Sequence, residues 1–423
     1  MKEWTPVLQV EVGFDFGEGY RKLGDAAATG SYVFFEFDTD FLAGGVNPSP
    51  FRLKFEGGPQ RGSEQLGGLP GLLDDSLPDG WSKLVLDRFI RSQGYSPDAL
   101  RPLDRIALVG TAGPGAITYQ SPITLPFTAP EVDFDTAADL VSNADTDEDV
   151  DRLNAAMALA GSLGGARPKA HVWLSNGRIT TRQAPGARQW IIKFPAKTDH
   201  PEAGAVEFAY SLMARAAGIV VPSTALLPSA HSPGYFAVER FDRTQTGGRI
   251  HVHSLGGLLH ASCRVPSLGY EELLRVTGAL AGAEALEQQV RRMAFNVFAR
   301  NRDDHVKNHA FLMGSDGKWQ TAPAFDLTYW DAREHEMIVG SEGAAPKLDH
   351  MLQVTRAVRM EDEQATCIIS EVEAVVREWP SFAKQASVSN ARTKEIGEAI
   401  QAGLPDFDIL AFAACQQSQG KSR

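Results

Sequence analysis

The stretch ARNRDDHVKNHAFL, residues 299–312, holds the densest group of polar side chains in the chain, and apolar patterns precede and follow it. Asp326 comes eighteen residues after Asn308, in the apolar context APAFDLTYW. Phosphoryl transfer requires an aspartate that orients the attacking hydroxyl, then an asparagine and a second aspartate that hold Mg²⁺. Asp303, Asn308 and Asp326 supply this set in this order. The spacing therefore predicts a phosphoryl-transfer site in which Asp303 is the catalytic aspartate.

A second candidate residue lies upstream, in a short apolar strand pattern. Lys193 is the cation inside WIIKFP. Burying a lone ammonium is costly, so we expect it to have a partner such as a phosphate or a carboxylate. Glu207, on the following helical pattern, is the nearest carboxylate candidate by analogy with the ion pair of protein kinases. Taken alone, Lys193 is better explained as an edge-strand lysine whose ammonium reaches water.

Composition excludes several classes of protein. The 423 residues contain 41 Lys and Arg against 53 Asp and Glu, a net charge of −12, which disfavours direct binding to nucleic acid or to an anionic membrane. The content of 43% hydrophobic residues is typical of a folded globular protein. No run of about 18 apolar residues occurs, and the start lacks the pattern of a signal peptide. We expect a cytoplasmic protein with no membrane contact.

The first 125 residues alternate β-rich runs with turn residues. A helix interrupts them around residues 77–94, where Leu86, Phe89 and Ile90 share a face and Gly94 offers a C-terminal stop. The runs expected to be extended are VLQVEVGFDF (7–16), SYVFFEF (31–37), FRLKFEGG (51–58) and RIALVGTAGPGAITY (105–119).

The rest of the chain changes character twice. Nine acids and no Lys or Arg lie between Glu131 and Asp151, which predicts a domain boundary. Residues 160–242 suggest a small sheet with one helix, whose apolar positions recur from Val206 to Ala217 and end at Gly218. From Tyr270 onward the apolar periodicity is helical.

Six motifs occur in an order and at spacings that resemble the HipA family of bacterial serine/threonine kinases, the toxins of HipBA-type toxin–antitoxin pairs. LLDDSLPDGW and LVGTAGPGAITY also resemble the amino-terminal subdomain of that family. The six are SLGGARPKA (162–170), WIIKFP (190–195), YFAVERFDR (235–243), NRDDHVKNHAFL (301–312), APAFDL (322–327) and EHEMIVG (334–340).

This resemblance implies an α+β, HipA-like and protein-kinase-like fold of two lobes. A β-rich N-terminal subdomain would span residues 1–125, and a nucleotide-binding lobe with a glycine loop would span 126–242. An all-helical C-terminal lobe, residues 243–423, would carry the catalytic and metal-binding residues.

The resemblance also implies roles for individual residues, with ATP and Mg²⁺ as cofactors. Asp303 would be the catalytic aspartate, and Asn308 and Asp326 the Mg²⁺ ligands. The nucleotide would be bound by Lys193, by Lys169 and Gly165 of the glycine loop, and by the hinge residues Glu239 and Phe241. Ser162 matches the serine whose autophosphorylation switches the kinase off, because a phosphoserine adds close to two negative charges beside the ATP phosphates.

The partners that the resemblance implies are proteins. One is a small HipB-like antitoxin with a helix-turn-helix, which would bring this chain to DNA only indirectly. The other is a protein substrate in translation, such as an aminoacyl-tRNA synthetase, whose phosphorylation arrests growth. The chain departs from the family pattern at Arg302, where a small residue is common. This guanidinium could bind the substrate or pair with an acid, and the neighbouring Asp304 could orient the loop or have no role.

Two other classes of function remain as alternatives. A pseudokinase would keep the fold and act as a binding module. A metal-dependent hydrolase could use His251 and His253, with His260 and the later Asp-Asp-His triplet, because a His-x-His pair on a strand suits Zn²⁺. The two histidines are also explained as surface residues of a short strand. The triplet at Asp303 would, in isolation, be explained as a solvated turn after a helix.

Overall fold

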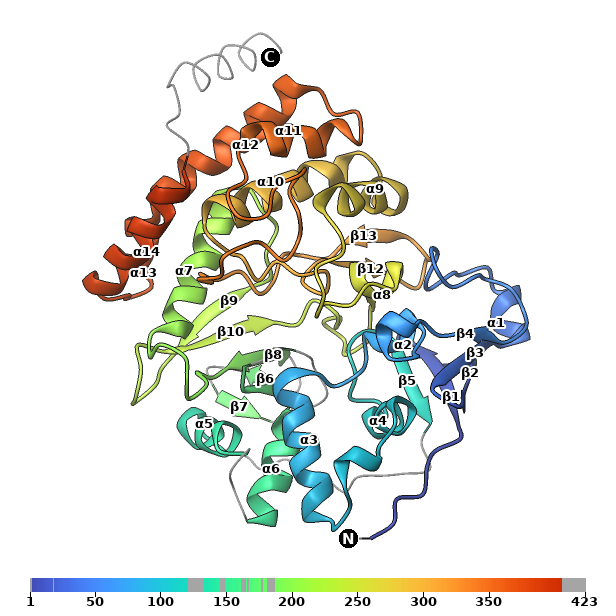
Figure 1. The fold of residues 1–423 in the computed structure, drawn as a ribbon. Coiled ribbons are helices and arrows are strands. Elements are labelled where there is room, and N and C mark those ends of the chain that lie inside the picture. The colour runs from blue at the N-terminus through green and yellow to red at the C-terminus, as the bar shows by residue number, and fades with distance from the viewer. Residues whose placement is uncertain are drawn as a thin grey trace. The chain divides into compact units, whose positions relative to one another are not determined.

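The computed structural model describes residues 2–17, 19–120, 132–144, 149–160, 165, 167–175, 178–180 and 187–404 (Figure 1). The N-terminal part forms a five-stranded sheet in the order β4-β3-β2-β1-β5, in which every paired strand is antiparallel. Its strands are β1 (Gln9–Asp15), β2 (Tyr20–Thr29), β3 (Tyr32–Phe37), β4 (Gln60–Arg61) and β5 (Ile117–Gln120). The helices of this part are α1 (Thr39–Ala43), α2 (Gly71–Asp74), α3 (Gly80–Ser92) and α4 (Pro102–Val109).

Two of the expected β-rich runs differ from the prediction: FRLKFEGG contains no strand, and RIALVGTAGPGAITY is extended only at its end, where residues 117–119 belong to β5. RIALVG lies mainly in α4, because Pro102 supplies a helical φ in its first turn and Asp104 accepts a hydrogen bond from Arg101 N (2.7 Å). FRLKFEGG forms turns, and the ring of Phe55 packs edge-on against Phe37 at a centroid distance of 5.2 Å. Local capping and side-chain packing therefore outweigh the β propensity of both runs.

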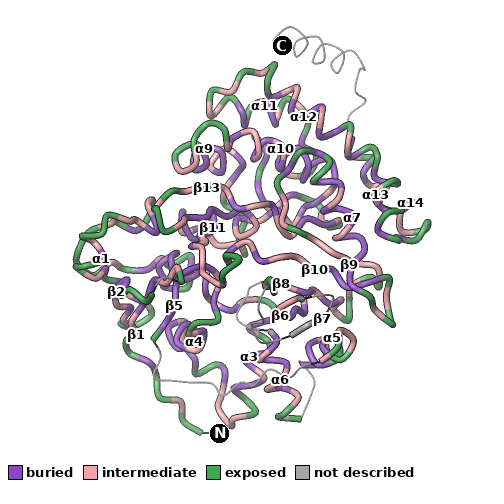
Figure 2. Tube along the Cα trace, turned by 180° about the vertical axis from the view of Figure 1, so that it is seen from behind, coloured by how far each residue is buried: buried purple, intermediate pink, exposed green. Residues whose placement is uncertain are grey.

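A second five-stranded antiparallel sheet follows, in the order β7-β6-β8-β10-β9. One face packs on α3, α5 and α6 through a core of fully buried side chains that includes Ala170, Val172, Ile192 and Ala237 (Figure 2). The elements are α5 (Phe134–Ser142), α6 (Val150–Ala160), β6 (Lys169–Ser175), β7 (Arg178–Thr180), β8 (Arg188–Lys193), β9 (Thr224–Leu227) and β10 (Tyr235–Glu239).

The remaining elements are mainly helical. Strand β11 (His251–Ser254) pairs antiparallel with β12 (Ala310–Met313). The expected helix that ends at Gly218 is α7 (Ala203–Ala216), and its predicted apolar positions are buried. Gly218 has a φ of +74°, the left-handed conformation that ends helices and favours glycine. The others are α8 (Leu255–Leu259), α9 (Tyr270–Ala281), α10 (Glu284–Phe298), β13 (Trp319–Thr321), α11 (Leu348–Arg356), α12 (Asp362–Arg377), α13 (Trp379–Gln385) and α14 (Asn390–Gly403).

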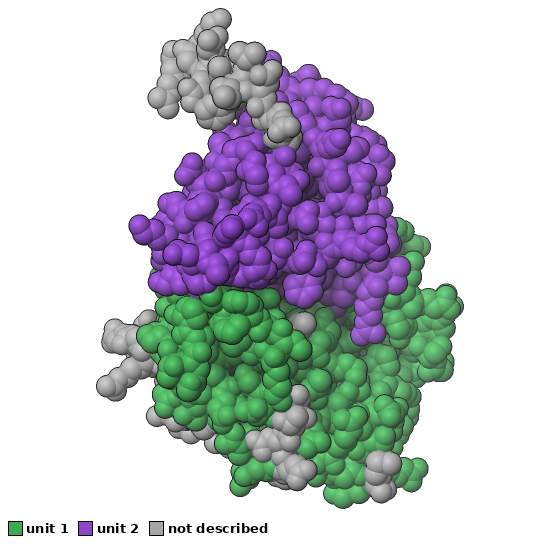
Figure 3. All heavy atoms as spheres, turned by 60° about the vertical axis from the view of Figure 1, so that its left-hand side comes forward, with its two compact units in different colours: residues 1–204, 223–261, 310–318 green, residues 205–222, 262–309, 319–423 purple. Residues whose placement is uncertain are grey.

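Contacts divide the chain into two compact units (Figure 3). The first contains both five-stranded sheets and the β11–β12 pair, in residues 1–204, 223–261 and 310–318. The second contains residues 205–222, 262–309 and 319–423, and β13 is its only strand among the described residues. The two units interleave along the chain, so the three-part division at residues 125 and 242 stays a prediction. The expectation that residues 243–423 are all helical is wrong, because strands β11, β12 and β13 lie in that range. In the described part of the chain, no helix combines the length and the hydropathy needed to cross a membrane.

The buried carboxylate of Asp104 connects the start of the chain to α4. Its oxygens accept hydrogen bonds from Val7 N (2.6 Å) and Arg101 N (2.7 Å), and the side chain is fully buried. We expect Asp104→Asn to lower the free energy of unfolding by about 2–3 kcal/mol, because the new amide group turns a donor toward backbone donors. Urea unfolding of the full chain measures the loss. The same substitution at the exposed Asp98 is the control, and an equal effect of the two would contradict the explanation.

Candidate functional site

The predicted catalytic loop, residues 299–309, follows α10 and precedes β12 in the chain. All of it belongs to the second unit. The side chain of Asp303 is 44% exposed, so its carboxylate can meet a ligand. Asn308 Nδ2 donates to the carbonyl oxygen of Asp303 (2.7 Å), and Asn308 N donates to the carbonyl oxygen of His305 (2.8 Å). The structure thus brings Asp303 and Asn308 together in one short loop. The amide nitrogen of Asn308 fixes the loop, and its oxygen is the atom that suits a cation.

Asp304 has the opposite environment to Asp303. It is 1% exposed and accepts three hydrogen bonds, from Tyr270 Oη (2.6 Å), His335 Nδ1 (3.0 Å) and Glu336 N (2.9 Å). Burial alone would raise the pKa of Asp304, but the hydrogen bonds from His335 and Tyr270 outweigh burial and lower that pKa. The structure supports the role of Asp304 in orienting the loop, because these three hydrogen bonds fix the loop to Tyr270 and to residues 335–336.

Tyr270 extends this network into the helices. Asn296 Nδ2 donates to Tyr270 Oη (2.9 Å), and Asn301 Nδ2 donates to Asn296 Oδ1 (2.9 Å). All of these side chains are buried. Residues from α9, α10 and the predicted catalytic loop therefore form one buried polar network, in which the side-chain amide nitrogens of Asn296 and Asn301 each have an acceptor.

Within the described residues Arg302 forms no ion pair with an acid, and its side chain is turned inward, so the structure supports neither of the two expected roles. It is 5% exposed, and its guanidinium donates to the backbone carbonyl oxygens of Ala332 (2.6 Å), Arg333 and Ala344 (2.5 Å). These acceptors lie 30 to 42 residues further along the chain, so the sequence offered no signal for them. Arg302 thus ties the segment that follows Asp326 to the catalytic loop.

Asp326 lies in the second unit in an unusual backbone conformation. Its φ is +53°, in the left-handed region that aspartate tolerates better than most residues. Ala324, two residues before it, is buried and donates from its backbone N to the carbonyl oxygen of Val220 (2.8 Å). Strained conformations of this kind gather at functional sites. The role of Asp326 as a metal ligand stays a prediction.

The predicted phosphate-binding lysines are in the first unit, and the sheet brings them together. Lys169 on β6 lies directly opposite Lys193 on β8. The ammonium of Lys193 is 5.6 Å from the ring centroid of Phe236, which lies on the next strand. A Cβ atom at Gly165 would come within 2.5 Å of Lys169 Nζ, so the lysine approaches the chain where glycine stands. Two cations on neighbouring strands suit an anion such as a phosphate.

Gly165 is held by the start of α3. Gly165 N donates to Asp79 Oδ1 (2.5 Å), and Trp81 N donates to the carbonyl oxygen of Gly165 (3.0 Å). Ser162 lies outside the described residues, so its role as a phosphorylation site stays a prediction. Glu207 is buried in α7, and its pairing with Lys193 also stays a prediction.

The predicted hinge follows β10. The carboxylate of Glu239 forms an ion pair with Arg188 (2.8 Å), so this side chain is engaged on β8. Glu239 N donates to the carbonyl oxygen of Ser223 (2.9 Å). A hinge binds adenine through its backbone, and the role of Glu239 and Phe241 in that contact stays a prediction.

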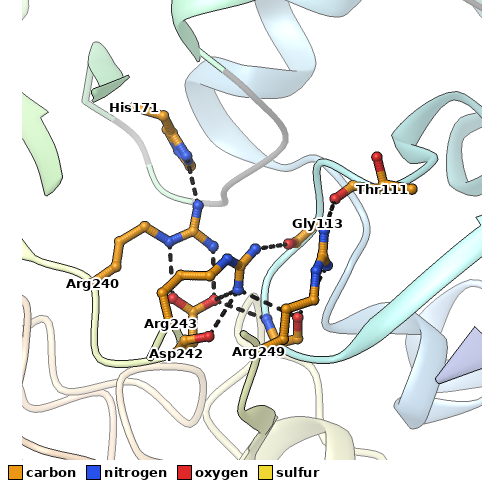
Figure 4. Close-up of polar contacts among 8 residues, drawn as sticks. Thr111, Gly113, His171, Arg240, Asp242, Arg243 and Arg249 are labelled. Carbon is orange, nitrogen blue, oxygen red and sulfur yellow. Dashed lines mark hydrogen bonds and ion pairs between the residues drawn. The ribbon is translucent and has the colours of Figure 1, made fainter. Parts of the chain in front are cut away.

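Directly after the hinge, the sequence analysis missed a buried cluster of charges in the first unit (Figure 4). Asp242 accepts from Arg240 Nε (2.9 Å), Arg240 Nη2 (2.7 Å), Arg243 Nη1 (2.7 Å) and Gly115 N (2.9 Å). Arg243 and Arg249 also donate to carbonyl oxygens of the turn at residues 111–115.

The pKa values of this cluster follow from burial and charge. Burial would raise the pKa of Asp242, but Arg240 and Arg243 outweigh it, so that pKa lies well below its usual range. Burial lowers the pKa of Arg243 to about 9, although Asp242 opposes the shift. The cluster links the turn of the N-terminal part to the predicted hinge. The motif VERFDR contained these residues, but it did not reveal their partners.

His251 and His253 are fully buried, so their interpretation as surface residues is wrong. His253 Nδ1 is 2.6 Å from Asp75 Oδ2, and His253 Nε2 is 2.9 Å from Ser49 Oγ. His251 Nε2 is 2.9 Å from the carbonyl oxygen of Pro48. Both ring nitrogens of His253 are thus in hydrogen-bond contact with protein atoms, and neither is left to bind a metal. The described residues contain no group of three or more His, Cys, Asp and Glu side chains placed to hold a metal. The hydrolase alternative therefore has no support in this geometry.

The order Ser49, His253, Asp75 is that of a serine-hydrolase triad, but burial excludes this role in the observed conformation. Ser49 and His253 have no solvent exposure. A nucleophile must reach the carbon that it attacks. Asp75 also accepts from Ser254 N (2.7 Å) and Ser254 Oγ (2.5 Å). These contacts connect β11 to the residue that follows α2.

Comparisons with known proteins decide the family. The model of the HipA-like C-terminal domain matches residues 161–379, and that of the HipA N-terminal domain matches residues 20–120. The first match alone spans more than half of the chain. The chain belongs to the HipA family. The expected resemblance is confirmed, and the predicted catalytic loop, both lysines and the predicted hinge of this HipA-family chain lie within the C-terminal match.

A solved structure confirms the α+β, HipA-like fold of this family member. It is the Shewanella oneidensis MR-1 toxin–antitoxin complex of HipA, HipB and operator DNA, with a TM-score of 0.67, 15% identity and 97% coverage of both chains. A protein of Sinorhizobium fredii (strain NBRC 101917 / NGR234), named "Putative kinase Y4dM", is 26% identical over 188 residues. That match covers 40% of this HipA-family chain and 45% of the relative, which is less than half of its length.

The anchor of the catalytic loop can be tested by removing one charge. We expect Asp304→Asn to lower the free energy of unfolding by about 2–3 kcal/mol, since hydrogen bonds to a charged group are worth about 1.5–3 kcal/mol. Hydrogen exchange of residues 300–309 and 333–340 should become faster in the same variant. The control is Asp331→Asn, at an exposed carboxylate of the same unit. Unchanged exchange in Asp304→Asn would contradict the anchoring role.

The buried His251 makes stability depend on pH. Burial, with a smaller effect of His253, lowers the pKa of His251 to about 3, whereas an unfolded histidine titrates near pH 6.5. Below pH 6.5 the unfolded chain binds the proton and the folded chain does not, so stability falls as the pH falls. At pH 5 we expect a loss of about 2 kcal/mol relative to pH 8.

His251→Gln is the matched variant, because its amide nitrogen can still donate to the carbonyl oxygen of Pro48. Its unfolding free energy, measured by urea titration at pH 8 and pH 5, should change less than that of the wild type. Equal changes in the two proteins would show that His251 becomes protonated in the folded state.

Proposed function

We propose that this HipA-family protein is an ATP- and Mg²⁺-dependent serine/threonine protein kinase that acts as the toxin of a toxin–antitoxin pair. The observation that carries the proposal is the contrast within the catalytic loop. Asp303 presents a half-exposed carboxylate, while the flanking Arg302 and Asp304 are buried and bonded. A carboxylate fixed in this way can orient a substrate hydroxyl and accept its proton as the γ-phosphoryl group is transferred.

The chemistry of the two proposed ligands, Asn308 and Asp326, fits Mg²⁺. Asn308 offers an amide oxygen and Asp326 a carboxylate, both hard oxygen ligands of the type that Mg²⁺ takes. Nucleotide sites commonly hold Mg²⁺ with one or two protein ligands and complete its shell with phosphate oxygens and water. When bound, the ion would neutralise charge on the phosphates. The role of Asn308 would be twofold, since its amide also fixes the carbonyl of Asp303.

Lys169 and Lys193 fit the phosphates of ATP. They lie opposite each other on β6 and β8, and Lys169 is 5% exposed. In a site with little water, a cation stabilises developing negative charge more strongly than it does in bulk solvent. Gly165 leaves room for Lys169, and the backbone of Glu239 and Phe241 would hold the adenine.

The regulation and the partners follow the family. Phosphorylation of Ser162 would add negative charge to the glycine loop and switch the kinase off. A HipB-like antitoxin would bind this chain and carry it to DNA, in line with the solved complex of HipA, HipB and operator DNA. The substrate would be a translation component, such as an aminoacyl-tRNA synthetase, and the cell compartment the cytoplasm.

Incubation with γ-³²P-ATP and Mg²⁺ tests the kinase function. The wild type should label itself, and Asp303→Asn should reduce the labelling at least about 10²-fold, because it removes the group that orients the hydroxyl and accepts its proton. Ser162→Ala should abolish self-labelling while labelling of a substrate in a cell lysate continues.

The matched control for Asp303→Asn is Asp331→Asn, which should label like the wild type. If neither the wild-type protein nor any lysate protein becomes labelled, the kinase proposal fails, and a pseudokinase that acts by binding is the better explanation. If the wild type does label proteins, phosphoproteomics of cells that express wild type or Asp303→Asn would identify or exclude the substrate in translation.

A further inference from the structure

His171 lies on the polar face of the second sheet, away from its apolar core. The residues on either side of it in β6, Ala170 and Val172, are fully buried in the core against the helices. Because side chains alternate along a strand, His171 shares the opposite face with Lys169. The register places Lys169 opposite Lys193, and His171 opposite Ile191.

The position along this face is informative. His171 is two residues from Lys169, a step of about 7 Å along the strand. The step leads toward the end of β10, because Ile191 pairs with Val238 whereas Lys193 pairs with Phe236. His171 is therefore in the row between the two lysines and the predicted hinge.

Arg240 determines which nitrogen of His171 carries the proton (Figure 4). Arg240 Nη1 is 2.9 Å from His171 Nδ1, and a guanidinium can only donate. Nδ1 therefore accepts, and the proton of the neutral ring is on Nε2. Burial, and then the charge of Arg240, lower the pKa of His171 well below its usual value, which keeps the ring neutral. Asp242 in turn holds Arg240 through two hydrogen bonds of 2.9 and 2.7 Å.

The Nε2–H group of His171 lacks an acceptor. The Nε2 atom has no contact with solvent, and no hydrogen-bond partner for it occurs in the described part of the chain. Buried donors in folded proteins nearly always have an acceptor, so an orphaned donor points to a group that the structure does not contain. Because Nε2 has no exposed surface, an acceptor on a ligand reaches it only when the side chains that cover it move on binding. The sequence analysis gave His171 no role.

We propose that His171 contacts the bound nucleotide and donates a hydrogen bond from Nε2–H to its adenosine part. This inference rests on the proposed function. Lys169 and Lys193 would bind the phosphates, and the hinge would bind the adenine ring. His171 lies between them on the sheet, so it would face the ribose or the adjoining edge of the base. The candidate acceptors are the 2′ and 3′ hydroxyl oxygens and adenine N3. Arg240 is a positioning residue, because it fixes the tautomer of His171.

Calorimetric titration of the full-length protein with ATP and Mg²⁺, in the Asp303→Asn background to prevent turnover, tests this contact. We expect His171→Leu to weaken nucleotide binding about 3- to 10-fold, the usual range for one hydrogen bond. His231→Leu, the same substitution at an exposed loop residue of the first unit, should bind as the parent protein does.

A pair of amide variants separates the contact from a packing effect. His171→Asn can keep the acceptor for Arg240 but loses the donor at the Nε2 position, so it should bind as weakly as His171→Leu. His171→Gln places an amide donor near the Nε2 position and should recover binding to within about threefold of the parent protein. This pair also serves if His171→Leu does not fold.

Nucleotide analogues identify the acceptor. 2′-Deoxy-ATP, 3′-deoxy-ATP and 3-deaza-ATP each lack one candidate atom. One of them should bind more weakly than ATP to the parent protein but equally with ATP to His171→Asn. If every analogue loses the same affinity relative to ATP in the parent protein and in His171→Asn, the donor does not reach the adenosine part and the inference is overturned.

Two further outcomes distinguish the inference from the function on which it rests. If the parent protein binds ATP and both His171→Leu and His171→Asn bind within twofold of it, an ordered water satisfies Nε2–H and the inference alone fails. If the parent protein binds no nucleotide while its fold is intact by circular dichroism, the proposed kinase function fails and the inference fails with it.

Discussion

The buried carboxylate of Asp304 is the constraint on which the catalytic loop depends. A charge removed from water must be compensated by donors, and leaving it uncompensated costs several kcal/mol. Asp304 receives its donors from Tyr270 at the start of α9 and from His335 and Glu336 beyond Asp326. The loop can therefore adopt this conformation only when α9 and the later segment are in place. Stability and the geometry of the candidate site are coupled through one side chain.

The same constraint explains why three consecutive charged residues have three different environments. Arg302 is buried with backbone carbonyls as acceptors, Asp303 is half-exposed, and Asp304 is buried with donors from side chains and backbone. The explanation of the triplet of Asp303, Asp304 and His305 as a solvated turn fails for Asp304, which is buried. Because both neighbours are fixed, Asp303 spends little conformational entropy when it orients a ligand, which is how preorganised sites work.

Sequence patterns predicted the fold where they were long and had clear ends. The apolar stripe of α7 spans several turns, and Gly218 ends it, so tertiary contacts had little to change. In α4 the pattern was shorter and ambiguous. Ile106 and Val109 suggested a strand, but a proline in the first turn and the buried cap at Asp104 made a helix. Short apolar runs carry less information than the polar residues that cap them.

For the site, the sequence predicted which residues carry charge but not where that charge is compensated. Asp303 and Asn308 are five residues apart, so their contact is local, and the motif contained it. The partners of Arg302 and Asp304 are about 30 to 42 residues away, at positions set by the return of the chain after Asp326. No periodicity encodes a pairing of that kind, because it depends on the path of an irregular segment.

The net charge of −12 is a property of the composition, and it does not describe the charge around the candidate binding residues. It predicts a chain whose overall field repels a nucleotide. Salt screens exposed charges beyond about 8–10 Å, so the field at a binding face depends on the groups close to it. Arg240 and Arg243 both bond to the carboxylate of Asp242, Arg249 donates to the nearby carbonyl oxygen of Gly115, and two lysines lie opposite each other on β6 and β8 of the same unit. The first unit thus gathers several cations within a short distance, and an anionic ligand at this face interacts with them more strongly than with the distant acidic residues of the chain.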